Sequence, residues 1–196
     1  MHIIRDYRDN ILSFQKVKFD SNYTGALSFR WIFYNKAIEK YNDRFPEKFI
    51  KIRFEDLIGD PEKTLTNLCS FLGVPFEPAI LHYYESAGSR IVPWQKNLTK
   101  PLDKNRVYSW KENMPATDLK TAEWICGSFG SRFGYKKTTA HPTWLEKPRV
   151  LPGLWLGIMA SFVESFLLFR LPLPIRSRAI RYYRIATGSL QKDETY

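Results

Sequence analysis

Residues 3–13 read IIRDYRDNILS, and two hydrophobic patterns meet within them. The apolar residues that open the stretch form a short run that ends at Arg5, and such a run predicts a strand. After the turn, apolar residues recur at helical spacing, and Asp6 and Asp9 suit the positive end of a helix that begins near Tyr7. The stretch therefore predicts a strand, a turn and a helix in direct succession.

The next elements repeat this alternation. Apolar residues at spacings of three and four predict a helix over 26–42, whereas residues 49–54 alternate between apolar and basic and predict a strand. Asp60 as the N-cap and Pro61 at the first helical position open a further helix, which Gly73 ends. Because strands alternate with helices, we predict an α/β fold in which helices flank a parallel sheet.

The rest of the chain divides by composition. The stretch 88–109 is polar and contains prolines, which predicts a long loop, and apolar periodicity predicts a helix over 114–130. We therefore expect three parts: a domain over 1–137, a linker over 138–150, and an apolar and basic helical extension over 151–196.

The overall composition narrows the class of protein. A hydrophobic content of 44% excludes a disordered acidic chain, and a net charge of +10 favours polyanionic partners such as phosphorylated nucleotides, anionic lipid, sulfated glycans or nucleic acid. Cys69 and Cys126 fall in different predicted helices without metal-ligand spacing, so we expect neither a disulfide framework nor a metal site. The first residues lack a signal-peptide pattern, and we expect a reduced, cytoplasmic compartment.

Arg5 and Ser13 are the first candidate binding residues. The arginine ends the predicted strand, and the serine follows eight residues later on the predicted helix. An arginine fork and a hydroxyl at a strand end are suited to holding a nucleotide phosphate. The residues alone leave a second interpretation open, in which Arg5 forms an ordinary salt bridge and Ser13 lies on the helix by chance.

The stretch 3–13 resembles the segment with which PAPS-dependent sulfotransferases bind the 3'-phosphate of their sulfate donor, 3'-phosphoadenylyl sulfate (PAPS). The spacing from arginine to serine matches, and Tyr7 stands where the family usually has proline. Three further segments are similar to the family's Y-E-D-L, D-P-E and F-L-G-V-P series: RFEDL at 53–57, DPEKTL at 60–65 and FLGVPF at 71–76. The resemblance spans residues 1–135.

This resemblance implies a fold of the P-loop-nucleotide type and an enzyme that moves a sulfuryl group from PAPS to a hydroxyl or amine, with PAPS as the only cofactor. Phe54 matches the tyrosine that lies near the donor's adenine, and its ring is suited to stacking. NRVYSWK at 105–111 is similar to the late loop that closes over the donor, which makes Arg106 and Lys111 candidates. The acceptor stays open between a small molecule, a glycan and a lipid.

Two parts of the family's machinery have no counterpart in this sequence. In the family, the glycine-containing loop that holds the 5'-phosphosulfate precedes the arginine segment, and so does the usual catalytic histidine or glutamate. His2, His82 and His141 match no position of the family's motifs, so the catalytic residues stay unassigned. We therefore expect the C-terminal portion of a sulfotransferase, N-terminally incomplete and inactive by itself.

A second class of function is a basic module that binds nucleotides or polyanions without catalysis. The net charge and the 16% of aromatic residues also suit single-stranded nucleic acid. The basic residues are scattered, however, and no recognition-helix or RNP pattern occurs in the sequence. We therefore expect no nucleic-acid partner.

The predicted extension has the composition of a membrane-surface segment. Residues 151–169 are strongly apolar and carry one charge, Glu164, and five arginines follow between 170 and 184. Burying an acidic side chain at a bilayer centre costs about 2.5–3.5 kcal/mol, which disfavours a span. We predict a helix whose apolar face lies against the domain or the membrane interface, with peripheral membrane contact through 151–184.

Overall fold

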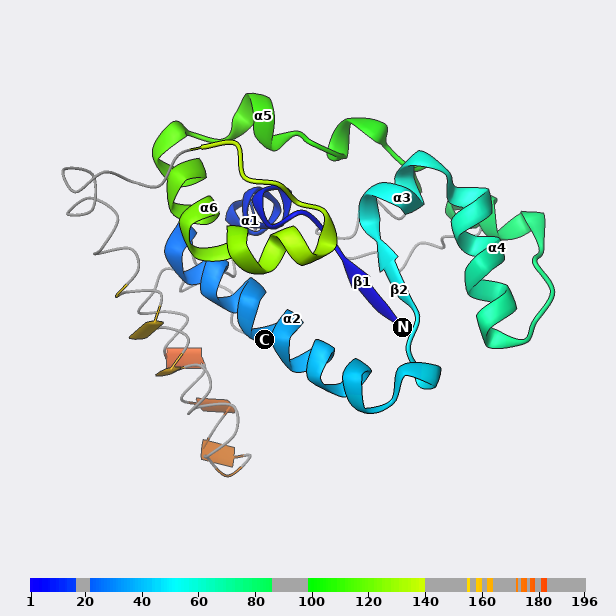
Figure 1. The fold of residues 1–196 in the computed structure, drawn as a ribbon, viewed down its shortest axis with the longest axis horizontal. Helices are drawn as coiled ribbons and strands as arrows, with labels where there is room; N and C mark the ends of the chain where they lie inside the picture. Colours follow the sequence, from blue (N-terminus) through cyan, green and yellow to red (C-terminus); the bar gives the residue numbers. More distant parts are fainter. Residues whose placement is uncertain are drawn as a thin grey trace. The chain divides into compact units, whose positions relative to one another are not determined.

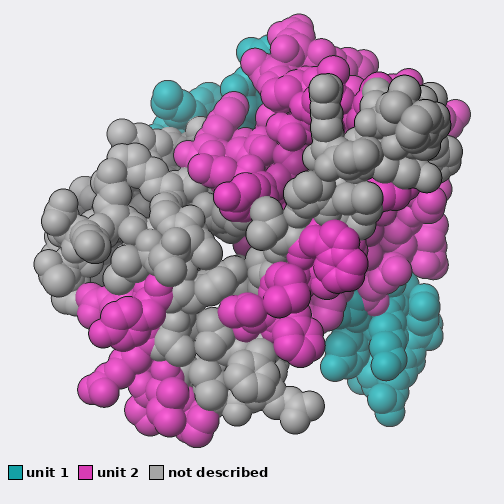
Figure 2. All heavy atoms as spheres, turned by 90° about the vertical axis from the view of Figure 1, so that its left-hand side faces the viewer, with its two compact units in different colours: residues 1–6, 37–109 teal, residues 7–36, 110–196 magenta. Residues whose placement is uncertain are grey.

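The computed structural model of this 196-residue chain describes residues 1–16, 22–85 and 99–139, together with scattered positions between 155 and 182. The chain divides into two compact units, each built from separate stretches of sequence (Figure 2). Unit 1 contains Met1–Asp6 and Ala37–Ser109, and unit 2 contains Tyr7–Lys36 and Trp110–Tyr196.

Unit 1 contains a sheet of two short parallel strands, β1 (His2–Ile4) and β2 (Lys51–Arg53) (Figure 1). The register pairs Ile4 with Arg53 at the ends of the two strands. Ile4 and Ile52 are buried, so apolar side chains hold both strands in the core of the unit. Because the strands are parallel, their carboxyl ends lie at the same edge of the sheet.

Two α-helices of unit 1 follow β2 in the chain. α3 (Phe54–Gly59) packs against β2 and against α4 (Pro61–Leu72). As predicted, the Asp60 carboxylate caps α4 by accepting a hydrogen bond from the Lys63 backbone N–H at 3.1 Å, and Gly73 ends the helix with a φ of +70°. The described part of unit 1 also contains short 3-10 helices: η1 (Pro46–Lys48), η2 (Pro78–Glu85) and η4 (Lys104–Arg106).

The strand predicted over 49–54 proves shorter than its alternating pattern indicates. It covers only Lys51–Arg53, and Phe54 begins α3 instead of ending the strand. Glu55 and Asp56 account for the early change, because acidic side chains stabilise the first turn of a helix.

In unit 2, the regular structure within residues 7–16, 22–36 and 110–135 consists of helices. α1 (Tyr7–Gln15) packs against α5 (Trp110–Asn113) and α6 (Ala116–Gly130), and η5 (Ser131–Phe133) continues α6. The residues of α2 (Thr24–Arg44) as far as Lys36 also belong to this unit.

Aromatic rings form the core of unit 2. Tyr7 is completely buried and meets Trp31 edge to face at a centroid distance of 5.6 Å, and Trp31 meets Phe129 in the same way at 5.8 Å. Gly130 allows α6 to approach this core closely, because a Cβ atom at that position would lie 2.7 Å from the Tyr7 ring.

The helix predicted over 26–42 is present as α2, but Tyr34 and Tyr41, two apolar residues of its periodic pattern, are 46% and 59% exposed. The buried face instead includes Ser28 and Asn35. Each of these side chains donates to the backbone oxygen four residues earlier at 2.7 Å, so the polar groups are satisfied inside the helix and their burial costs little.

The predicted α/β class is confirmed as a mixed fold with parallel strands. The predicted linker and extension fall mostly outside the described residues, so the three-part division stays a prediction. Residues 88–98 of the predicted loop also fall outside them. Within the described part of the chain, no helix is long and apolar enough to cross a membrane.

Candidate functional site

The parallel register brings Arg5 and Phe54 together. Ile4 pairs with Arg53, and the next residue on each chain segment leaves the same edge of the sheet. The Arg5 guanidinium carbon lies 4.7 Å from the centre of the Phe54 ring, which is cation–π geometry. Both side chains are half-buried.

Arg106 joins this pair from far along the sequence. Its backbone oxygen accepts a hydrogen bond from Arg5 Nη2 at 2.7 Å, and its guanidinium carbon lies 6.0 Å from the Phe54 ring centre. The Asp103 carboxylate fixes the start of η4 by accepting a hydrogen bond from the Asn105 backbone N–H at 2.9 Å. We call Arg5, Phe54 and Arg106 the arginine–phenylalanine cluster.

The cluster has the electrostatics of an anion site. Two guanidinium groups face one ring at the carboxyl edge of parallel strands, and like charges held close together repel. An oxyanion relieves this repulsion and accepts the planar donor fork that arginine provides. Three of the five residues that the sequence predicts for the site therefore lie together.

The other two predicted site residues, Ser13 and Lys111, belong to unit 2. Ser13 is half-buried on α1, and Lys111 is exposed on α5. The convergence of Ser13 with Arg5 on one phosphate stays a prediction.

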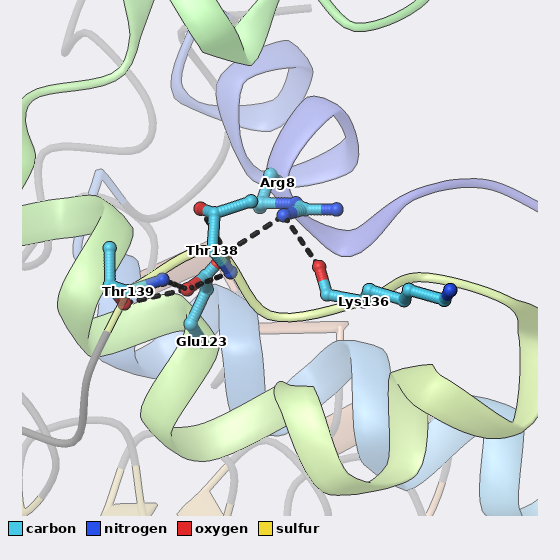
Figure 3. A network of polar contacts seen from close by, with 5 residues as sticks. All are labelled: Arg8, Glu123, Lys136, Thr138 and Thr139. Carbon is cyan, nitrogen blue, oxygen red and sulfur yellow. Dashed lines mark hydrogen bonds and ion pairs between the residues drawn. The ribbon is translucent and has the colours of Figure 1, made fainter.

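Arg8, the second arginine of the RDYRD segment, has a structural role that the sequence did not indicate. It is buried in unit 2, and its Nη1 donates to Glu123 Oε1 at 2.8 Å and to the Lys136 backbone oxygen at 3.1 Å (Figure 3). Its guanidinium carbon also lies 3.8 Å from the centre of the Trp110 ring. Asp9 accepts a hydrogen bond from the Trp110 backbone N–H at 2.9 Å, so Trp110 is a core anchor and starts α5 there.

Glu123 is the centre of this buried network. The backbone N–H groups and hydroxyls of Thr138 and Thr139 donate to its two carboxylate oxygens at 2.6–2.9 Å (Figure 3). Burial by itself raises the pKa of Glu123, but the hydrogen bonds from Thr139 and Thr138 outweigh burial and leave the pKa below its usual value. The network ties the chain after α6 to α6 and α1.

Glu55 is a further buried carboxylate, in unit 1, that sequence reasoning missed. Its Oε1 accepts a hydrogen bond from the Asp6 backbone N–H at 2.8 Å. The resemblance of RFEDL to the family's segment implies a role for the ring of Phe54 and none for Glu55.

A cleft of 520 Å³ in unit 1, whose lining includes the two neighbours of Phe54 in sequence, is a weaker candidate for a phosphate site. Its charged lining residues have both signs: Lys51, Arg53 and Lys63 with Glu55, Asp56 and Asp60. Lys51 also pairs with Glu39 at 2.9 Å. The cleft therefore lacks the excess of positive charge that the arginine–phenylalanine cluster has.

The described histidines do not stand in a catalytic arrangement. His2 is buried with its Nδ1 3.7 Å from Glu39, and His82 is exposed and contacts Glu85 at 3.1 Å. His141 lies outside the described residues. Within the described ranges, no group of three or more side chains is arranged to bind a metal ion.

Comparison with known proteins identifies sulfotransferases as relatives of this chain. Residues 1–78 match the model of the Sulfotransferase family. Over 149 residues the chain is 27% identical to protein-tyrosine sulfotransferase 1 of Danio rerio, with 68% of this chain and 41% of that protein covered. Over 116 residues it is 26% identical to carbohydrate sulfotransferase 2 of Mus musculus and of Homo sapiens, with 52% of this chain and 21% of those proteins covered.

The chain thus spans less than half the length of these relatives. The family match includes Arg5, Ser13 and Phe54, whereas Arg106 and Lys111 lie beyond it. Two of the three cluster residues, Arg5 and Phe54, therefore fall inside the matched range. The chain is therefore similar to sulfotransferases, through residues 1–78 in the family model and at 26–27% identity in these relatives.

Proposed function

We propose that the arginine–phenylalanine cluster binds the 3'-phosphate end of PAPS and that the whole protein is a sulfotransferase that uses PAPS as its donor. The observation that carries this proposal is the gathering of two guanidinium groups around one aromatic ring at a sheet edge. A phosphate neutralises the two cations, and adenine stacks on an aromatic face. Ligands of parallel α/β sheets bind at this edge, which also favours a larger sheet of the P-loop-nucleotide type in the whole protein.

The residues of the chain hold and orient the donor. When bound, PAPS supplies an activated sulfuryl group, and the acceptor supplies a hydroxyl or amine. Arg5 fixes the far end of the nucleotide, and a fixed nucleotide loses less entropy when the reacting atoms meet. Transfer also requires a base for the acceptor proton, and none is assigned, so we expect the purified chain to bind donor nucleotide without turnover.

The relatives bear names that specify protein tyrosine and carbohydrate acceptors. Both are hydroxyl compounds, which supports a hydroxyl on a small molecule, a peptide side chain or a glycan as the acceptor here. A lipid acceptor is the remaining alternative, and the exposed apolar residues of the extension are the feature that favours it.

Binding of adenosine 3',5'-bisphosphate (PAP) tests the proposed function. We expect isothermal titration calorimetry to show PAP bound at least tenfold more tightly than 5'-AMP, because the 3'-phosphate forms charge-assisted hydrogen bonds worth about 1.5–3 kcal/mol. Radiolabelled PAPS with a panel of phenol, sugar and lipid acceptors is expected to give no transfer. Equal affinity for PAP and 5'-AMP contradicts the phosphate site, and robust transfer contradicts the inactivity of the chain.

We also propose that the extension makes peripheral contact with an anionic membrane, at a cytoplasmic face. Trp155, Met159 and Phe162 have helical backbone conformation and are 63%, 56% and 68% exposed. Arg178 and Arg181 are exposed as well. Exposed aromatic residues with nearby arginines are typical of segments that lie in the headgroup region of a bilayer.

Vesicle flotation is expected to recover the chain with vesicles that contain phosphatidylserine and not with neutral vesicles. Raising the salt concentration should release it, because screening weakens the attraction of arginines to anionic lipid. Trp155→Ser combined with Phe162→Ser should reduce recovery severalfold. Phe33→Ser, which removes an exposed ring from α2, is the matched control and should change nothing. Carbonate-resistant insertion, or no flotation at any salt concentration, contradicts peripheral contact.

A further inference from the structure

Glu55 connects the two chain segments that carry Arg5 and Phe54. Its Oε1 accepts the backbone N–H of Asp6 at 2.8 Å, and its Oε2 lies 3.9 Å from Arg53 Nε. Only 7% of its surface is exposed. The carboxylate therefore forms a buried bridge between the turn after β1 and the start of α3.

The bridge lies directly next to two residues of the arginine–phenylalanine cluster. Asp6 directly follows Arg5, and Glu55 directly follows Phe54. The strand register ends at the pair of Ile4 and Arg53, and the bond to Glu55 continues the connection beyond the strand ends. Side-chain direction is coupled to backbone conformation, and this bond holds the backbone directly after Arg5.

We propose that Glu55 is a positioning residue for the donor site, and this inference rests on the proposed function for the identity of the ligand. Glu55 acts through Arg5 and does not itself contact the nucleotide. A buried carboxylate near an anion site would repel the ligand, but the charge of Glu55 is engaged by a backbone N–H and faces the Arg53 guanidinium. It therefore orders the site at little electrostatic cost to the bound phosphate.

Three substitutions separate positioning from general effects of charge and stability. Glu55→Ala removes the acceptor for the Asp6 N–H, and we expect PAP to bind about tenfold more weakly. Glu55→Gln keeps an acceptor oxygen, and we expect it to restore affinity to within about threefold of wild type. Asp56→Asn is the matched control: Asp56 also lies 3.9 Å from Arg53 but is 60% exposed, so we expect no change.

Hydrogen exchange of the backbone amides near Asp6, measured without nucleotide, provides a second readout. We expect faster exchange in Glu55→Ala and wild-type exchange in Asp56→Asn. If the wild type binds PAP and Glu55→Ala binds it equally well, the positioning role is wrong and the proposed function stands. If the wild type does not bind PAP, the proposed function fails. Faster exchange in Glu55→Ala then still supports a bridge that holds the turn after β1, and unchanged exchange overturns it.

Discussion

Replacing Arg5 with glutamine is expected to weaken the binding of PAP roughly 30- to 100-fold. Hydrogen bonds to charged groups contribute about 1.5–3 kcal/mol, and each 1.4 kcal/mol changes a dissociation constant tenfold. Arg5 donates to the Arg106 backbone oxygen and lies over Phe54, so glutamine removes the charge and the contact that arranges the cluster. Titration calorimetry at fixed salt concentration measures the loss.

Arg44 provides a matched control for this substitution. It lies in the same unit, it is exposed, and its guanidinium carbon is 5.2 Å from the Phe45 ring centre, so it forms the same kind of pair away from the sheet edge. Arg44→Gln changes the net charge equally, and we expect PAP affinity within about twofold of wild type. If Arg5→Gln and Arg44→Gln lose the same PAP affinity, PAP binding depends on overall charge, and the proposed site at Arg5 is wrong.

The sequence contains enough information to predict the pairing of Arg5 with Phe54. Arg5 and Phe54 each stand at the end of a predicted strand, and the ends of parallel strands lie at one edge of a sheet, so both residues are expected at that edge. Arg106 was reached through the resemblance of its loop to a known segment. Local pattern alone does not show which distant loop approaches a given sheet edge, because that depends on contacts between residues about a hundred positions apart.

The burial of several polar residues could not be predicted from the sequence. Arg8 and Glu123 are charged, and hydrophobic periodicity assigns charged residues to the surface, yet both side chains are almost completely buried as a pair. Ser28 and Asn35 of α2 are buried for a related reason, since each bonds to its own helix backbone. Burial of these groups depends on partners that a one-dimensional pattern does not contain.

The pair of Arg8 and Glu123 gives the largest expected effect on stability. In Glu123→Gln, the Arg8 guanidinium stays buried without its carboxylate, and breaking a buried ion pair in this way costs about 3–5 kcal/mol. The amide NH₂ of glutamine would also face the N–H and O–H donors of Thr138 or Thr139. Because an NH₂ group cannot accept these hydrogen bonds, the donors on that side would lose their partner. Urea denaturation followed by tryptophan fluorescence measures the loss of unfolding free energy. Glu112→Gln, at an exposed position of α5, is the matched control and is expected to change it by less than about 0.5 kcal/mol.

The pH dependence of this loss tests the charge of Glu123 directly. Its pKa is lowered in the folded protein from a usual value of 4.5, so the folded state favours the ionised carboxylate more than the unfolded chain does. A lowered folded pKa stabilises the protein fully above the unfolded pKa, and this contribution is lost as the pH falls through the folded pKa. The difference in unfolding free energy between wild type and Glu123→Gln should therefore be constant near neutral pH and should shrink as the pH is taken below 4.5. A difference that stays the same down to pH 3 would mean that glutamine acts through shape alone, and that the charge on Glu123 does not hold Arg8 in place.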